Sequence, residues 1–178
     1  MNFEEFAAKP LLAAGGIAVP PSQVVVSAEE AGVAAETIGP CVVKAQVPTG
    51  KRGKAGGIKL AATPDEARTH ADTILGMKIG GYTVEKLLVE GQVPIARELY
   101  AAVLNDPVTC GPVVLFSPLG GMDVEEAAEQ DPNAMRRMPV DIREGLDAGK
   151  AAGLLSGLNL DGQHDAIAEV LVKLYDVY

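Results

Sequence analysis

Short apolar runs alternate with helical patterns through the first 75 residues. Three runs rich in Val, Ile and Leu indicate strands, and two segments open with Ser or Thr followed three positions later by Glu, a signature of helix N-termini. Strands are therefore predicted over 23–26, 41–47 and 58–61, and helices over 27–38 and 63–75. This alternation indicates an α/β or α+β domain of the nucleotide-binding type.

The rest of the chain carries signals of the same kind. An N-terminal helix, with Asn2 and Glu5 as a capping pair and Pro10 inside it, is predicted to end at a glycine pair. Two apolar runs on either side of a Gly-Gln-Val-Pro segment predict an antiparallel hairpin. The hairpin strands would be 83–89 and 95–104, with a strand over 112–117 and helices over 141–155 and after 162.

Composition and charge exclude several classes of protein. The chain has 178 residues, 48% of them apolar, so it can form one cored domain or a domain with a small lobe. No apolar run approaches the roughly 20 residues that span a bilayer, and the N-terminus carries acids where a secretory signal carries bases. The formal charge of −9 resides in residues 71–178, which speaks against an extended nucleic-acid-binding face. We expect a cytoplasmic protein without membrane or nucleic-acid partners.

The two cysteines do not form a disulfide framework. Cys41 and Cys110 both lie beside predicted strands, and we expect them to be buried free thiols in a reducing compartment. Neither belongs to a C-x-x-C pair or lies near a histidine, so a zinc site is not expected. His70 and His164 are interpreted as surface residues of helices.

A local concentration of positive charge stands out in this acidic chain. Residues 44–59 contain five basic side chains and no acid, and a strand ending in Lys44 leads into a glycine-rich loop. Backbone amides at glycines, flanked by Lys and Arg, favour phosphate binding. The loop matches neither a P-loop nor a dinucleotide-binding fingerprint. An exposed hairpin whose cations only keep it soluble remains the alternative.

Several segments together resemble the ATP-grasp domain of the succinyl-CoA synthetase β-subunit family. The resemblance is most specific over 43–59 and extends, in order, over 1–9, 75–76, 87–90 and 95–100, and more loosely over 120–125 and 139–141. It implies an ATP-grasp fold of the α/β (α+β) class. It divides the chain into an N-terminal helix and linker (1–20), a nucleotide-binding lobe (21–104) with a phosphate loop (48–57), and a second, incomplete lobe (105–178).

The resemblance also implies a set of nucleotide-binding residues. Lys44 would contact the phosphates, Glu90 and Val93 the base, and Glu98 would be an acid that faces the nucleotide. The loop positions Lys51, Arg52 and Gly53 match a Gly-Arg-Gly segment of the family, with Lys51 in place of the first glycine. This departure leaves the acid substrate open. No catalytic residue is assigned to this chain.

The implied reaction is that of an ADP-forming acid–CoA ligase. Succinate, CoA and ATP would give succinyl-CoA, ADP and phosphate through a phosphohistidine on a separate α subunit. The alternatives are a related ligase, such as malate–CoA ligase, and a non-catalytic nucleotide-binding or interaction module. ATP with Mg²⁺ is the implied cofactor pair.

The metal ligands of the family have no counterpart in this sequence. They are an Asn in a Glu-Ile-Asn-Pro segment and a later Asp, and we expect them beyond Tyr178, in a polypeptide that continues. The acids Asp123, Glu125, Glu126 and Glu129 fit a solvated face better than a metal cluster. The 178 residues alone are therefore expected to be inactive.

Overall fold

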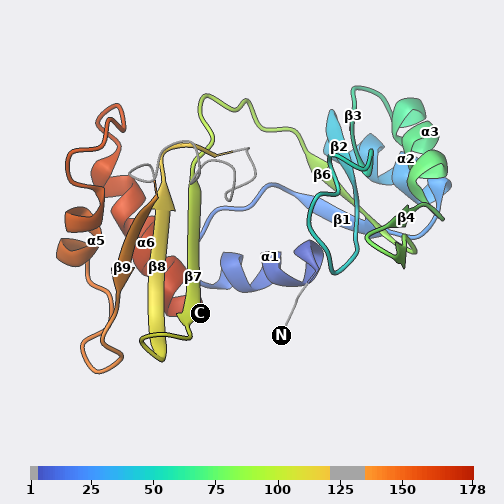
Figure 1. Ribbon diagram of the computed structural model, residues 1–178. Coiled ribbons are helices and arrows are strands. Elements are labelled where there is room, and N and C mark those ends of the chain that lie inside the picture. The colour runs from blue at the N-terminus through green and yellow to red at the C-terminus, as the bar shows by residue number, and fades with distance from the viewer. Residues whose placement is uncertain (1–3, 121–134) are drawn as a thin grey trace. The chain divides into compact units, whose positions relative to one another are not determined.

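The computed structural model describes residues 4–120 and 135–178, and the chain forms two compact units (Figure 1). Unit 1 comprises Met1–Ala13 and Ala18–Pro94, and unit 2 comprises Ala14–Ile17 and Ile95–Tyr178. The predicted lobe boundary after residue 104 falls inside a strand, β7 (Tyr100–Asp106). The division lies at Pro94 instead, because β7 forms its backbone hydrogen bonds within unit 2.

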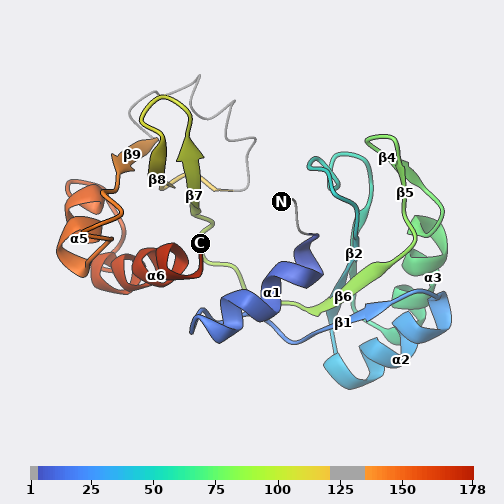
Figure 2. The same ribbon diagram turned by 90° about the horizontal axis from the view of Figure 1, so that it is seen from below.

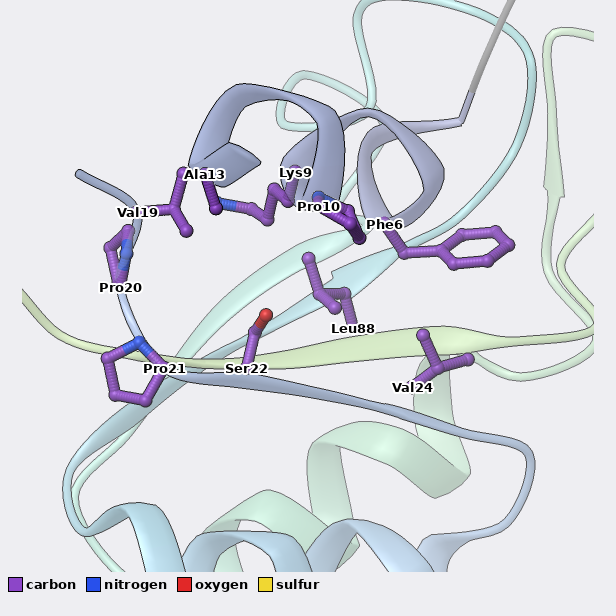
Figure 3. A pocket seen from close by; sticks show the side chains of 10 residues that line it. All are labelled: Phe6, Lys9, Pro10, Ala13, Val19, Pro20, Pro21, Ser22, Val24 and Leu88. Carbon is purple, nitrogen blue, oxygen red and sulfur yellow. The ribbon is translucent and has the colours of Figure 1, made fainter. Parts of the chain in front are cut away.

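Unit 1 is built on a four-stranded antiparallel sheet with helices on both faces (Figure 2). The strand order is β1-β6-β2-β3. Helices α2 and α3 cover one face and α1 lies over the other, as the close view in Figure 3 also shows. The elements are α1 (Glu5–Ala14), β1 (Ser22–Val25), α2 (Ala28–Ile38), β2 (Cys41–Ala45), β3 (Ile58–Ala61), α3 (Pro64–Ile74) and β6 (Leu87–Gly91).

The alternation of side chains along β2 separates the core from the opposite face of the sheet. Cys41, Val43 and Ala45 are buried in the core formed with α2 and α3, whereas Lys44 points to the opposite face. Alanines of the two helices complete this core, and their small side chains allow close packing. The two faces of the sheet are therefore chemically different: one is apolar, and the other carries charge.

The predicted helix starts in unit 1 are confirmed. Ser27 Oγ accepts a hydrogen bond from the Glu30 amide, and Thr63 Oγ1 accepts one from the Glu66 amide, both at 3.2 Å. Helix α1 continues through Pro10 and ends at Ala14, before the glycine pair. The proposed cap residue Asn2 lies outside the described residues.

A small two-stranded ribbon, which the sequence pattern did not reveal, divides the predicted strand 83–89. Strands β4 (Lys78–Ile79) and β5 (Tyr82–Thr83) pair across Gly80 and Gly81. The two glycines have φ values of +58° and +87°, which a two-residue turn with positive φ at both positions requires. The strand that follows, β6, begins only at Leu87.

Unit 2 contains an antiparallel sheet with two helices packed against it (Figure 1). The strand order among its described residues is β7-β8-β9. Phe116 and Val114 of the sheet pack with Leu155 and Leu171 of the helices, and all four are essentially inaccessible to solvent. In addition to β7, the described elements of unit 2 are β8 (Gly111–Ser117), β9 (Arg136–Pro139), α5 (Ala148–Leu155) and α6 (His164–Val177).

The predicted hairpin between 83–89 and 95–104 is wrong. Strand β6 lies between β1 and β2, and β7 pairs with β8. Both edges of β6 are therefore paired within the sheet of unit 1, and neither is left for β7.

Two further expectations for unit 2 are corrected. The predicted helix over 141–155 begins only at Ala148, because Asp147 caps it by accepting a hydrogen bond from the Lys150 amide. Cys110 is exposed, since it lies at φ +53° in the turn between β7 and β8, while Cys41 is buried as expected. Burial raises the pKa of the Cys41 thiol. Both cysteines are free.

The β7–β8 turn of unit 2 supplies a pH-dependent contribution to stability. Hydrogen bonds from Arg137 and then Thr109 lower the pKa of Asp106 to about 2. Because the pKa of Asp106 is lower in the folded state than the value of 3.8 in the unfolded chain, its ionised carboxylate stabilises the fold fully at pH values above 3.8. This contribution is lost as the pH falls toward 2. We expect Asp106→Asn to lower the melting temperature at pH 6, with the difference from wild type vanishing near pH 2. A difference that stays constant with pH would contradict this prediction, and the exposed Asp65→Asn is the control.

No helix within the described parts of the chain is long and apolar enough to cross a bilayer.

Candidate functional site

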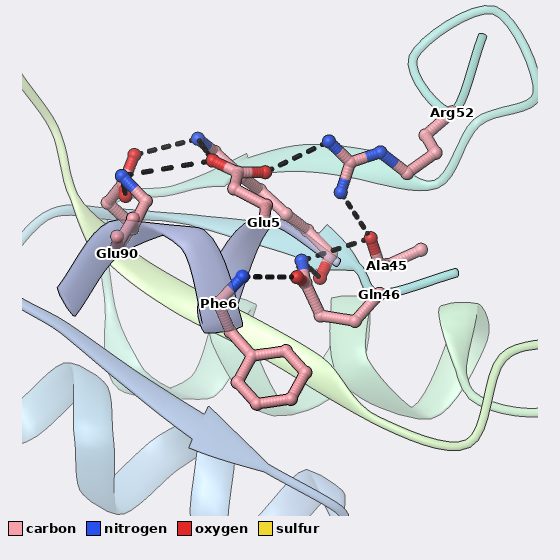
Figure 4. Close-up of polar contacts among 8 residues, drawn as sticks. Glu5, Phe6, Ala45, Gln46, Arg52 and Glu90 are labelled. Atoms are coloured by element: carbon pink, nitrogen blue, oxygen red, sulfur yellow. Dashed lines mark hydrogen bonds and ion pairs between the residues drawn. The ribbon is translucent and has the colours of Figure 1, made fainter. Parts of the chain in front are cut away.

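The charged face of the unit 1 sheet places Lys44 between two carboxylates. Lys44 Nζ donates hydrogen bonds to Glu90 Oε1 at 2.7 Å and to Glu5 Oε1 at 2.9 Å (Figure 4). Glu90 comes from β6, the strand next to β2, and Glu5 comes from the first turn of α1. The strand lysine is therefore fixed in position from two sides.

Glu90 is held by a second lysine. Its residue exposure is 6%, and its other carboxylate oxygen is in ion-pair contact with Lys9 Nζ of α1. Lys9 also lies 3.8 Å from Glu5, one helical turn away. We refer to Glu5, Lys9, Lys44, Arg52 and Glu90 as the charge cluster.

Arg52 brings the predicted phosphate loop into the charge cluster. Arg52 Nη2 donates to Glu5 Oε2 at 3.0 Å, and Nη1 donates to the Ala45 carbonyl at 2.8 Å (Figure 4). The base of the loop is closed by backbone hydrogen bonds from Ala45 N to Gly57 O and from Gly57 N to Arg52 O. A Cβ atom on Gly57 would lie 2.6 Å from Ile79 Cδ1, 3.1 Å from Ala45 Cβ and 3.2 Å from the Arg52 carbonyl oxygen, so a side chain here would require these neighbours to shift. Strand and loop therefore present their cations to the same carboxylate.

The pKa values within the charge cluster follow from burial and pairing. Burial opposes ionisation of Glu5, but the hydrogen bonds and charges of Lys44 and Arg52 outweigh it, so the pKa of Glu5 is lowered. Burial likewise opposes the charge on Lys44, and Glu90 and Glu5 outweigh it, so the pKa of Lys44 is raised. Both side chains therefore remain charged at neutral pH.

Lys51 has an unusual backbone conformation at the start of the loop. Its φ is +62°, in the left-handed region that favours glycine. This geometry gives a physical reason for the glycine at this position in the family that the sequence resembles. Lys51 adds a cation at the expense of backbone strain.

We expect Lys51→Gly to raise the free energy of unfolding of unit 1 by about 1 kcal/mol, because it removes that strain. Lys51→Ala is the matched control, since it removes the same charge but keeps a Cβ atom in the left-handed region. Denaturant unfolding measures both variants. Equal stability of the two would show that the backbone conformation is not the cause.

The remaining predicted site residues lie outside the charge cluster. Gly53 is exposed in the loop, where its carbonyl accepts a hydrogen bond from Gly56 N at 3.0 Å. Val93 is 55% exposed beyond the end of β6. Glu98 is an exposed residue of unit 2, and its carbonyl accepts a hydrogen bond from Gly120 N at 3.0 Å. The structure thus brings together Lys44, Arg52 and Glu90.

Sequence reasoning assigned no part in the site to three residues that build it. Glu5 and Lys9 of α1 are members of the charge cluster, and buried Gln46 links α1 to β2. Gln46 accepts a hydrogen bond from Phe6 N at 3.0 Å and donates to the Lys44 and Ala45 carbonyls. The Glu-x-x-x-Lys spacing of Glu5 and Lys9 on one helix was the available signal. The partners of this pair, Lys44 and Arg52 for Glu5 and Glu90 for Lys9, lie 39 to 81 positions further along the chain and were not visible in the pattern.

No group of three or more His, Cys, Asp and Glu side chains that could hold a metal ion occurs in residues 4–120 and 135–178. We assign no step to a metal here. The acids Asp123, Glu125, Glu126 and Glu129 lie outside the described residues. His164, at the start of α6, has a ring nitrogen 3.0 Å from the Leu158 carbonyl oxygen, and His70 lies in α3, as expected.

Comparison with curated proteins finds relatives along the whole chain. The chain is 44% identical over 179 residues to the β subunit of a GDP-forming succinate–CoA ligase from Thermus thermophilus, and 42% identical over 181 residues to that of an ADP-forming ligase from Halorubrum lacusprofundi. Each match covers 100% of this chain and 47% of the relative. The chain therefore spans about half the length of the curated relatives it matches.

Solved structures share the fold. A dinucleotide-forming acetyl-coenzyme A synthetase from Ca. Korarchaeum cryptofilum, in complex with coenzyme A and Ca-AMPCP, superposes with a TM-score of 0.78 at 25% identity, covering 98% of this chain and 79% of that one. An ATP citrate lyase from Methanothrix soehngenii shows the same fold with a TM-score of 0.71 at 24% identity, covering 99% of this chain and 43% of that one.

The model of the ATP-grasp domain matches residues 2–178. The predicted ATP-grasp fold, a mixed α/β arrangement with antiparallel sheets, is thereby confirmed. The chain belongs to the ATP-grasp domain family.

Proposed function

We propose that this chain is the nucleotide-binding portion of the β subunit of an acid–CoA ligase of the succinate–CoA ligase type. The observation that carries the proposal is the convergence of Lys44 and Arg52 on one carboxylate, at 2.9 and 3.0 Å. Two cations that share a carboxylate can share a phosphate group, because both ligands are anions with oxygen acceptors. The identity of 42–44% to succinate–CoA ligase β subunits over the whole chain supports the class of enzyme.

The proposed roles follow from position. Lys44 and the loop residues Lys51, Arg52 and Gly53 neutralise the phosphates, and preorganised cations of this kind stabilise charge during phosphoryl transfer. The carboxylate of Glu90 is held by Lys9 and Lys44, so we assign Glu90 the role of fixing Lys44 in position. The base would then be contacted by the residues after Glu90, including Val93. The role of Glu98 stays a prediction from the resemblance.

The complete reaction needs groups that we place elsewhere. We propose an α subunit that carries the phosphohistidine, ATP as the nucleotide, and Mg²⁺ bound by ligands outside this sequence. Free Cys41 and Cys110 are consistent with the cytoplasm as the location. Because Lys51 departs from the glycine of the family, we retain malate as well as succinate as a candidate acid substrate.

Titration calorimetry of the purified chain with ATP, GTP and ADP tests the proposal. We expect saturable binding of one or more of these nucleotides, without formation of succinyl-CoA from succinate and CoA. Absence of binding to all three would favour an interaction module without nucleotide. Turnover of ATP by this chain alone would contradict the assignment of the phosphohistidine to another subunit.

A further inference from the structure

The carboxylate of Glu5 occupies the position at which the proposed phosphate-binding cations converge. Its two oxygens accept hydrogen bonds from different cations: Oε1 from Lys44 Nζ at 2.9 Å and Oε2 from Arg52 Nη2 at 3.0 Å. Lys9 lies 3.8 Å from the same carboxylate. A phosphate group that reaches Lys44 and Arg52 must therefore compete with an anion that belongs to the protein.

The element that carries Glu5 is weakly packed. None of the residues of α1, all of which the structure describes, is buried. Between α1 and the sheet lies an open cavity of about 490 Å³, lined mainly by apolar side chains such as Phe6, Pro10, Val24 and Leu88 (Figure 3). Apolar packing thus contributes little to holding α1 in place, because burial of apolar surface is what gives most helices their stability.

Charges and hydrogen bonds attach the helix instead. Besides Glu5, Lys9 pairs with Glu90, and Gln46 Oε1 accepts a hydrogen bond from Phe6 N. Just before the helix, Glu4 Oε2 lies 2.7 Å from Lys86 Nζ. Another anion can take over such contacts without repacking of a core, because it offers oxygen acceptors to the same cations.

We propose that Glu5 is an internal competitor of the nucleotide phosphates and sets the affinity and phosphate requirement of the site. Its carboxylate pairs with both Lys44 and Arg52. Binding of a polyphosphate displaces its carboxylate and loosens the first turn of α1. An anion must offer more charge than one carboxylate to replace it, so a triphosphate competes better than a single phosphate. This inference rests on the proposed function, because it assumes that Lys44 and Arg52 bind phosphate.

The test compares Glu5→Gln with wild type in titrations with ATP, inorganic triphosphate and inorganic phosphate. We expect Glu5→Gln to bind triphosphate about tenfold more tightly, because a neutral amide competes poorly for Lys44 and Arg52. Glu85→Gln is the matched control: it removes the same charge from an exposed side chain of unit 1 outside the charge cluster and outside α1, and its affinity is expected to equal that of wild type. Equal or weaker binding by Glu5→Gln would overturn the inference while leaving the proposed function intact. Absence of binding to every variant would overturn both.

Hydrogen exchange of wild type gives a second readout that needs no substitution. Saturating triphosphate is expected to accelerate amide exchange in residues 5–14, where loss of the Glu5 contacts loosens the helix. Slower or unchanged exchange in this segment, together with confirmed binding, would show that Glu5 stays in place and that the inference is wrong.

Discussion

Replacing Lys44 by methionine is expected to weaken ATP binding by about 10- to 100-fold, the range that corresponds to loss of one charge-assisted contact. Methionine keeps the apolar stem of the side chain and removes the ammonium group that Glu5 and Glu90 hold in place. Calorimetric titration of wild type and variant measures the effect, and circular dichroism verifies that the variant is folded.

Lys59→Met is the matched control for this prediction. Lys59 belongs to β3, the strand paired with β2, and it is exposed. The variant loses the same charge from the same basic segment, so a general electrostatic effect would weaken binding equally in both. Equal loss of affinity in the two variants would contradict a specific role of Lys44. Unchanged affinity in Lys44→Met would contradict the proposed phosphate site itself.

Replacing Glu90 by alanine is expected to have the largest effect on stability, a loss of about 3 kcal/mol in the free energy of unfolding. The Glu90 side chain is 8% exposed, and it is the carboxylate shared by Lys9 and Lys44. Without it, two largely buried ammonium groups have only Glu5 as a nearby carboxylate within the charge cluster. Removing one partner from a buried charge pair is costly because the other charge remains out of water.

Denaturant unfolding of Glu90→Ala and of Glu85→Ala checks this expectation. Glu85 is an exposed acid in the same unit, and its replacement is expected to change stability by no more than about 0.5 kcal/mol. A similar small change for Glu90→Ala would mean that the charge cluster contributes little to the fold. Unit 1 would then depend on its apolar core alone.

The two capped helices of unit 1 and the glycine-rich loop were predictable because their signals are local. The caps at Ser27 and Thr63 act on amides three residues away, and the glycine-rich segment after β2 forms a loop between two strands as expected. Membership of the ATP-grasp family could also be predicted from the sequence, since residues 43–59 carry the specific pattern of the resemblance. Each of these features depends on neighbours in the chain.

The partners of β6 and of the site cations were decided only by the tertiary structure. Strand β6 lies between β1 and β2, and these two strands occupy both of its edges, so it does not pair with β7. Glu5 reaches Lys44 and Arg52 across 39 and 47 positions of sequence. No local pattern encodes such a contact, because it depends on which face of the sheet α1 covers.

The sequence alone therefore determined that this protein has an ATP-grasp domain with a cationic loop after Lys44. The tertiary structure decided that Lys44 and Arg52 share the carboxylate of Glu5. The physical reason is that capping, turn chemistry and strand alternation act over a few residues, whereas charge pairing in a fold depends on distances in space.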